Sequence, residues 1–221
     1  MKIDFHVHTN FSTDSTIKVK DLAKKSQELG VIPAITDHST IAANNEFRKT
    51  GVKFIPGEEI RTDCGDLIVL YPTEEIEPHI LFPDAIDRIK EQGAISILPH
   101  MYDITRYGCG DKYAGLVDAI EIFNARCLNK SFNERAAGIA RRMKKPGVAG
   151  SDSHFLFEFG KTYTELPDFD IENPKELMKA LKSEKKKIIG NKAPFYVRGP
   201  TAVYKAARKL KKKLGMGKDI K

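Results

Sequence analysis

The feature that most constrains the fold is an alternation of short apolar runs with amphipathic stretches along most of the chain. Runs with strand character occupy residues 2–8, 31–36, 52–60, 66–71, 94–98, 116–123 and 147–151. Helical periodicity occupies residues 18–30, 82–93, 128–145 and 173–183. Because strands that alternate with helices usually form parallel sheets, the pattern predicts one α/β domain with mostly parallel strands.

Histidines and carboxylates recur where these predicted strands end. The strand-end residues are His6, His8, Asp37, His38, Glu58, Glu59, His100, Asn124, Asp152 and His154. Five of the six histidines belong to this set, and we interpret the sixth, His79, as an ordinary surface residue. Since the carboxyl ends of parallel strands gather at one edge, these side chains are expected to form one site.

The residue types in this set indicate a metal centre. Alternate residues on a strand point the same way, so His6 and His8 can bind one ion, and Asp152 and His154 share that spacing. The three cysteines are widely separated and lack CxxC spacing, which argues against a disulfide framework or a thiolate site. Imidazole and carboxylate ligands suit Zn, Mn or Fe, and their number predicts two or three divalent ions.

Six segments carry a resemblance to a known family. In chain order they are DFHVHTNFSTDS, AITDHST, IPGEEIRT, ILPH, IEIFNAR and GSDSH, spread over residues 4–154. This series resembles the motifs of the PHP (polymerase and histidinol phosphatase) family of metal-dependent phosphoesterases. The resemblance implies a distorted (β/α)7 TIM-like barrel with a trinuclear metal site at the C-terminal face of the strands.

The resemblance also implies the ligands. By position they are His6, His8, Asp14, His38, Glu59, His100, Asn124, Asp152 and His154. Glu59 is preferred to Glu58 as the bridging carboxylate because the family pattern is G-x-E. Asp14, His38 and His154 would bind the third ion and act in catalysis, through a water on that ion that protonates the leaving oxygen.

Asn124 departs from the family pattern, because several relatives have a histidine there. Two interpretations stay open: Asn124 is a weak, neutral ligand, or it forms hydrogen bonds at the strand end. Glu121 is a third option, although residues three apart on a regular strand point to opposite faces.

The implied reaction is hydrolysis of a phosphomonoester, or of a nucleotide or oligonucleotide phosphate, by a metal-activated water. The expected partner is a phosphorylated small molecule or nucleotide. Cations near the strand ends are candidates for binding its phosphate; they are Arg61, Arg106, Lys112 and Arg126.

The net charge of +7 is concentrated at the end of the chain. Residues 205–221 hold eight Lys or Arg and one Asp, so residues 1–204 are neutral overall. We therefore divide the chain into a phosphoesterase domain at 1–204 and a basic C-terminal tail at 205–221. The tail is either a nucleic-acid-binding element or a solvated terminus that maintains solubility.

Two other functions are weighed against the phosphoesterase. Amidohydrolase barrels also begin with HxH on the first strand, but the SDSH, TDH and GEE segments fit the PHP series better. A metal-stabilised module that binds nucleic acid or protein without turnover is the third interpretation. With no run of about 18 apolar residues and no signal-peptide pattern, we expect a cytoplasmic protein without membrane contact.

Overall fold

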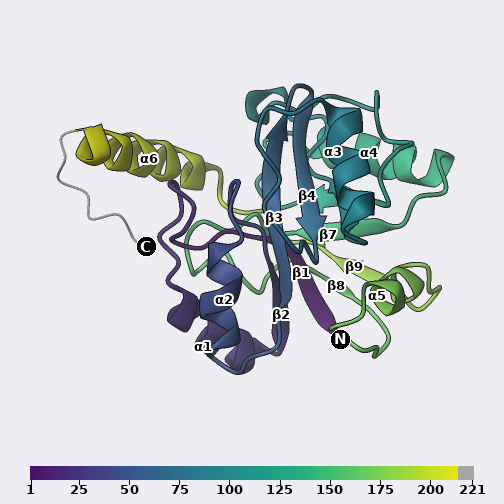
Figure 1. Cartoon of the computed structure of the whole chain (residues 1–221), viewed down its shortest axis with the longest axis horizontal. Helices are drawn as coiled ribbons and strands as arrows, with labels where there is room; N and C mark the ends of the chain where they lie inside the picture. The colour runs from purple at the N-terminus through teal and green to yellow at the C-terminus, as the bar shows by residue number, and fades with distance from the viewer. Residues whose placement is uncertain (214–221) are drawn as a thin grey trace.

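The computed structural model describes residues 1–213, and the strands of this part of the chain form one sheet (Figure 1). The strand order is β7-β6-β5-β4-β3-β2-β1-β8-β9. The strands are β1 (Lys2–Val7), β2 (Val31–Ile35), β3 (Ile55–Thr62), β4 (Gly65–Leu70), β5 (Ile95–Leu98), β6 (Ala119–Asn124), β7 (Gly147–Gly150), β8 (Tyr163–Glu165) and β9 (Lys187–Ile189).

Helices pack around this sheet. They are α1 (Val19–Leu29), α2 (Ala42–Arg48), α3 (Phe82–Glu91), α4 (Lys130–Arg142), α5 (Pro174–Leu181) and α6 (Arg198–Lys213), with 3-10 turns at Ile104–Arg106 and Phe195–Val197. Within residues 1–213, none of these helices has the length and apolarity needed to cross a membrane.

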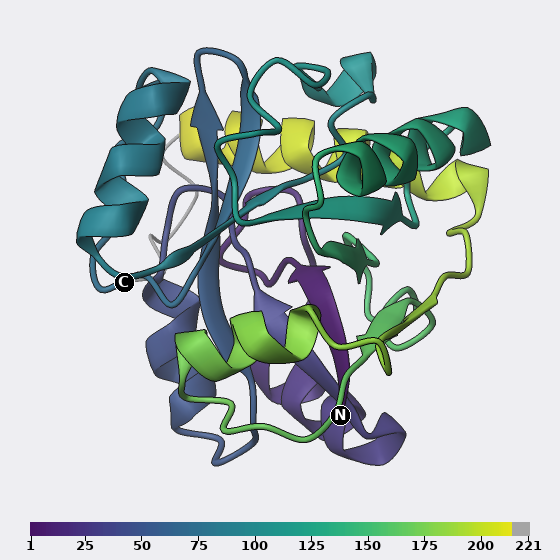
Figure 2. The ribbon, with the colours of Figure 1, turned by 90° about the vertical axis from the view of Figure 1, so that its right-hand side faces the viewer.

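The sheet curls until β1 and β7 meet, as Figure 2 shows. The Asp152 amide donates to the His6 carbonyl over 2.7 Å, and the His8 amide donates to the Ser153 carbonyl over 3.1 Å. A parallel bridge between Val7 and Ser153 lies between these two bonds. Strands β1 to β7 therefore form a nearly closed, distorted barrel, which confirms the predicted α/β barrel fold.

The direction of β4 corrects one expectation. This strand runs antiparallel to both β3 and β5, and β8 and β9 also pair antiparallel. Parallel and antiparallel pairings in the described sheet are four each, so the prediction of mostly parallel strands is wrong. The cause is the tight turn between Thr62 and Gly65, which is too short for the crossover that a parallel pair requires.

Alternation along the strands separates an apolar floor from a polar rim inside the barrel. On β4, Ile68 and Leu70 belong to a buried apolar cluster, whereas Asp66, which lies on the same face by alternation, is polar. On β3, Ile55 and Glu59 show the same division. The fold thus supports the polar strand ends on a packed apolar layer.

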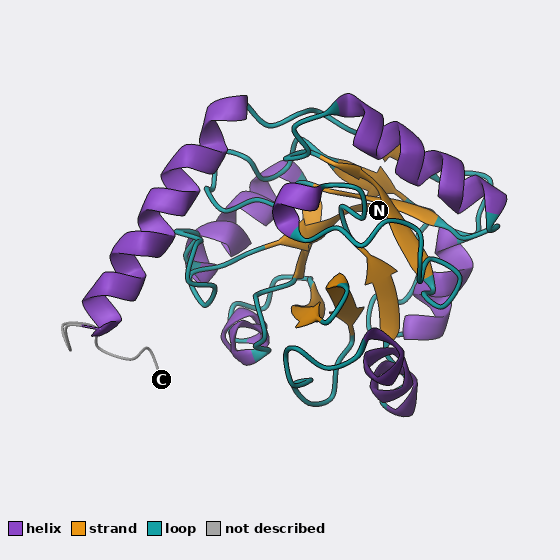
Figure 3. Cartoon of the chain, turned by 90° about the horizontal axis from the view of Figure 1, so that it is seen from above, coloured by secondary structure: helices purple, strands orange, loops and turns teal. Residues whose placement is uncertain are grey.

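The predicted boundary between residues 204 and 205 falls inside helix α6. The first part of the predicted tail, residues 205–213, is helical, and residues 214–221 lie outside the described residues. The helix starts beside the barrel, and its far end extends away from the body of the molecule (Figures 1 and 3).

Gly57 lies in the middle of the β2–β3–β4 contact and gives a test of the barrel packing. A Cβ atom at this position would lie 2.8 Å from the Val69 carbonyl oxygen and 2.9 Å from the Ile35 carbonyl oxygen. Because both neighbours are backbone atoms, Gly57→Ala is expected to lower the free energy of unfolding by about 1–3 kcal/mol. Chemical denaturation would measure it.

The matched control is Gly138→Ala in helix α4, where a Cβ atom would meet nothing within 4 Å. This substitution is expected to stabilise the protein by about 0.5–1 kcal/mol, since alanine favours helix interiors. Equal effects of the two substitutions would contradict the close packing of β3 between its neighbours.

Candidate metal centre

Four imidazoles surround the carboxylate of Glu59, which is 2% exposed. Its Oε2 atom lies 3.5 Å from His6 Nε2, 3.4 Å from His8 Nε2 and 3.0 Å from His38 Nδ1. Its other oxygen, Oε1, lies 3.1 Å from His100 Nε2. Glu58, the neighbouring carboxylate, points elsewhere and accepts a hydrogen bond from the Ile76 amide.

Two aspartates extend the cluster toward the fifth histidine. Asp152 Oδ1 lies 3.4 Å from His8 Nε2 and 3.6 Å from His154 Nδ1. Asp14 lies between His38 and His154, with oxygen–nitrogen distances of 3.4 and 3.5 Å. All the histidines and carboxylates predicted as ligands therefore converge at one end of the barrel.

The local backbone has the conformations that this convergence requires. A Cβ atom on Gly150 would lie 2.4 Å from the Cβ of His6 and 2.3 Å from Glu121 Oε1, so only glycine lets these side chains approach. Asp152, two residues later, has a positive φ of 55°. His100 also has a positive φ, of 25°. Such unfavourable conformations are typical of functional sites held by their surroundings.

Three of the histidines are oriented through their second ring nitrogen. His6 Nδ1 lies 3.1 Å from Glu121 Oε1, and His8 Nδ1 lies 3.2 Å from Ser12 Oγ. His154 Nδ1 lies 2.9 Å from the Asp152 carbonyl oxygen. Each contact fixes the ring and directs Nε2 toward the cluster, as the outer partners of metal-binding histidines do.

The electrostatics of the cluster are strongly coupled. Burial alone would lower the pKa of His6, but the charges of Glu59 and Glu121 raise it to about 10. His38 is partly exposed, and desolvation would also lower its pKa, yet Glu59 and Asp14 raise that pKa to about 10. Protonated imidazoles therefore balance the carboxylates in the metal-free protein, and a metal ion that binds these nitrogens displaces their protons.

The arrangement fits divalent cations. Four groups of three side chains each place one ligand atom per residue within 4.8 Å of the others. They are His8, His38 and His154; His6, His100 and Asp152; His6, His8 and Glu59; and Glu59, Asp66 and His100. Nitrogen and carboxylate oxygen without sulfur is a donor set for Zn, Mn or Fe.

Asp66 is a member of this cluster that the sequence reasoning missed. It lies at the beginning of β4, whereas ligands were expected only at the ends of strands. Because β4 runs antiparallel, its first residues reach the rim where the parallel strands end. Burial and the charge of Glu59 raise the pKa of Asp66, and the guanidinium of Arg61 pairs with it.

Strand β6 contains an irregularity that places both Glu121 and Asn124 in the site. The pairing register with β7 shifts between Glu121 and Phe123, so the expected placement of Glu121 on the opposite face from Asn124 is wrong. The Asn124 amide nitrogen donates to Glu121 Oε2 over 2.9 Å and to Asp152 Oδ2 over 3.1 Å. The Asn124 amide oxygen accepts hydrogen bonds from Arg106 and from the Arg126 amide.

The four predicted phosphate-binding cations are placed differently. Arg61, Arg106 and Arg126 line the cavity above the cluster, which has a volume of about 370 Å³. Arg106 pairs with Asp152 and Asp103. Lys112 is exposed outside this cavity, with its ammonium 4.6 Å from the ring centroid of Tyr113.

Arg126 is more enclosed than a surface cation. Its guanidinium donates to both oxygens of Glu158 over 2.9 and 3.2 Å and to Thr201 Oγ1 over 2.8 Å. Glu158 in turn accepts hydrogen bonds from the amides of His154 and Phe155. Arg126 therefore connects helix α6 to the loop that carries His154.

Comparisons with known proteins agree with this site. The PHP domain family matches residues 4–108, and the PHP-associated family matches residues 130–185. The uncharacterized protein MJ0417 of Methanocaldococcus jannaschii is 35% identical over 185 residues, which is 80% of this chain and 75% of that protein.

Two solved structures share the fold. A two-domain protein from Bacteroides vulgatus, which contains a predicted PHP-like metal-dependent phosphoesterase, has a TM-score of 0.69 at 16% identity, over 92% of this chain and 69% of that one. The lesion-specific endonuclease PfuEndoQ from Pyrococcus furiosus has a TM-score of 0.59 at 16% identity, over 85% and 57% of the two chains. The barrel and the imidazole–carboxylate cluster are those of a metal-dependent hydrolase, and the chain belongs to the PHP domain family.

Proposed function

We propose that the protein is a phosphoesterase that hydrolyses a phosphomonoester or a nucleotide or oligonucleotide phosphate. The observation that carries this proposal is the position of Arg61 and Arg106 in the same cavity as the histidine–carboxylate cluster. An anionic substrate needs cationic side chains beside the metal ligands, and guanidinium groups suit phosphate oxygens in geometry and charge.

Each part of the site has a separate task in this proposal. His6, His8, Glu59 and Asp152 hold ions at the floor of the cavity, and Asp14, His38 and His154 form a second binding group nearer its edge. When bound, divalent ions lower the pKa of coordinated water and neutralise phosphate oxygens. Arg106, placed at the Asp152 side, orients the phosphate against this floor.

Asp14, His38 and His154 would hold the third ion, and water at that ion, rather than these side chains, is the proposed source of the proton for the leaving oxygen. His38 and His154 each lie within ion-pair distance of Asp14, at 3.4 and 3.5 Å, and His38 is the most exposed histidine of the cluster, with a side chain 33% exposed. This position gives solvent, and a leaving group, access to the edge of the cluster.

Two other functions remain as alternatives with the same ligands. A binding module would hold the ions as structural elements and turn over no substrate. An amidohydrolase would cleave amide bonds instead of phosphate esters. The cavity arginines favour the phosphate ester, and a panel of phosphate esters and amides separates the three.

Removal of one central imidazole tests catalysis. We expect His8→Ala to lower manganese-dependent phosphate release by about 100-fold or more, since even outer partners of metal ligands affect activity by about 10–100-fold. The panel includes histidinol phosphate, nucleoside monophosphates and bisphosphates, and 5′-phosphorylated oligonucleotides. Metal content is measured in parallel by mass spectrometry.

His79→Ala is the matched control, because His79 is exposed and lies outside the cluster. It is expected to keep wild-type activity and metal content. Absence of turnover on every ester, with metal bound in the wild type, would contradict the proposed enzyme and favour the binding module.

The arginines that line the cavity above the cluster give a second prediction. Arg106→Ala is expected to lower kcat/KM for the best phosphate ester about tenfold or more, because hydrogen bonds to charged groups contribute about 1.5–3 kcal/mol. Lys112→Ala, which removes a cation outside the cavity, is expected to leave kcat/KM unchanged. Steady-state kinetics at matched metal content compares the two, and an equal effect would argue against phosphate binding by Arg106.

A further inference from the structure

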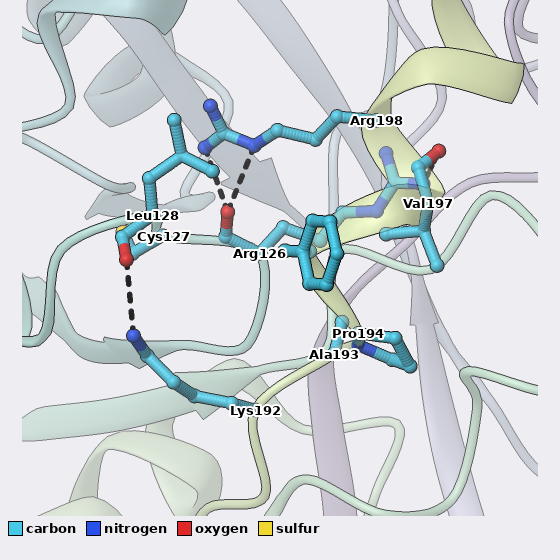
Figure 4. Close-up of a pocket in the computed structure, with 9 residues that line it drawn as sticks. Arg126, Cys127, Leu128, Lys192, Ala193, Pro194, Val197 and Arg198 are labelled. Carbon is cyan, nitrogen blue, oxygen red and sulfur yellow. Dashed lines mark hydrogen bonds between the residues drawn. The ribbon is translucent and has the colours of Figure 1, made fainter.

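A second cavity adjoins the metal centre and is not used by the proposed reaction. It has a volume of about 250 Å³ and lies between residues 126–128, which follow β6, and residues 192–198, which lead into α6 (Figure 4). Arg126 and Arg198 line both this cavity and the one above the metal cluster. These two arginines therefore separate a ligand in the second cavity from the cavity above the metal cluster.

Hydrogen bonds between the two segments hold this second cavity open. The Arg198 guanidinium donates to the Arg126 carbonyl oxygen through Nε and Nη2, over 3.0 and 2.7 Å, and Lys192 Nζ donates to the Leu128 carbonyl oxygen over 3.1 Å (Figure 4). The Ala193 amide also donates to the Ala125 carbonyl oxygen, over 2.9 Å. The cavity is thus formed before any ligand binds, which lowers the entropic cost of binding.

Large apolar side chains are exposed around this cavity. Phe195 is 84% exposed and Leu128 is 52% exposed, and both line it. The adjacent Tyr196 is 59% exposed, with its ring centroid 5.9 Å from that of Phe195. Exposed aromatic rings beside cations are a stacking platform for nucleobases, since every base has a π face.

The charge of this part of the chain has one sign. Residues 191–213 contain eight Lys or Arg and no Asp or Glu, whereas residues 1–190 contain 27 Lys or Arg and 29 Asp or Glu. The segment also lies outside both family matches, which end at residues 108 and 185. Its charge of a single sign favours contact with a polyanion.

Helix α6 connects this charge to the metal centre. Thr201 and Ala202 line the cavity above the cluster. Arg208 Nη1 donates to the carbonyl oxygens of Asn10 and Ser12 over 3.1 and 3.0 Å, which holds the helix beside the loop that carries Asp14. From there the helix extends away from the barrel (Figures 1 and 3).

From these observations we infer that residues 191–213 bind a single-stranded polynucleotide and lead it into the metal centre. One base stacks on Phe195 in the second cavity, and its phosphate reaches the cluster past Arg126 and Arg198. A single strand is specified because a base must leave a duplex before it can stack on a side chain. This inference rests on the proposed function only for the hydrolysis of the bound strand. Binding of the strand itself is measured without turnover.

The test is the affinity of the full-length, manganese-loaded protein for a fluorescent DNA strand of about 12 nucleotides. Phosphorothioate linkages slow its hydrolysis, and fluorescence anisotropy measures binding. Phe195→Ala is expected to weaken binding about tenfold, since one base stack is lost. Phe157→Ala, which removes a half-exposed ring that lines neither cavity, is expected to bind like the wild type.

The inference would be overturned by equal affinities of the two variants, by tighter binding of the same sequence as a duplex, or by an affinity of the wild type that does not change with salt. A dimer that Phe195→Ala dissociates, with unchanged strand affinity, would identify the surface as a contact between copies of the chain and would also overturn it.

Hydrolysis of small phosphate esters by the wild type separates this inference from the proposed function. Ester hydrolysis without strand binding leaves the phosphoesterase intact and overturns the inference. Strand binding that depends on Phe195, without hydrolysis of any ester, supports the inference and contradicts the enzyme.

Discussion

The buried carboxylate of Glu59 is the interaction on which the rest of the site depends. A charge this far from water costs several kcal/mol unless it is compensated, and four imidazole nitrogens lie within 3.5 Å of it. Those imidazoles come from the ends of β1, β2 and β5, so the barrel must close correctly before the charge is compensated. In the metal-free protein the compensation comes from protons on His6 and His38, and bound cations would replace them.

Closure of the barrel and assembly of the cluster are therefore one event. The hydrogen bonds between the end of β1 and residues 152–153 close the barrel and also bring the HxH segment against Asp152. Gly150 allows this approach because it has no side chain to keep His6 and Glu121 apart. Arg126 and Glu158 extend the same network to helix α6, so the C-terminal segment is part of the site's support.

The sequence predicted much of this arrangement because its signals are local. Alternation on β1 and the helical period of α1 and α3 are readable without tertiary knowledge, and the structure has these elements within a few residues of the expected bounds. The convergence of His6, His38 and His100 followed from one rule, that parallel strands end at one edge. Short elements such as β8, β9 and α2 were missed because three to seven residues carry little periodic signal.

The features that the sequence did not predict depend on the path of the chain in space. Asp66 reaches the cluster because β4 is reversed, and Glu121 does so because β6 changes register. Neither event has a local signal as clear as the HxH spacing. Similarly, nothing in the sequence distinguishes Lys112 from Arg106, although the loop places only Arg106 in the cavity.

The histidine–carboxylate cluster around Glu59 is proposed to be a metal centre. X-ray diffraction from crystals grown with Mn²⁺, recorded on both sides of the manganese absorption edge, tests it most directly. Anomalous peaks are expected between Glu59, His6 and His8, and between Asp14, His38 and His154. Crystals saturated with manganese that show no peak inside the cluster, or peaks only on the surface, would contradict it.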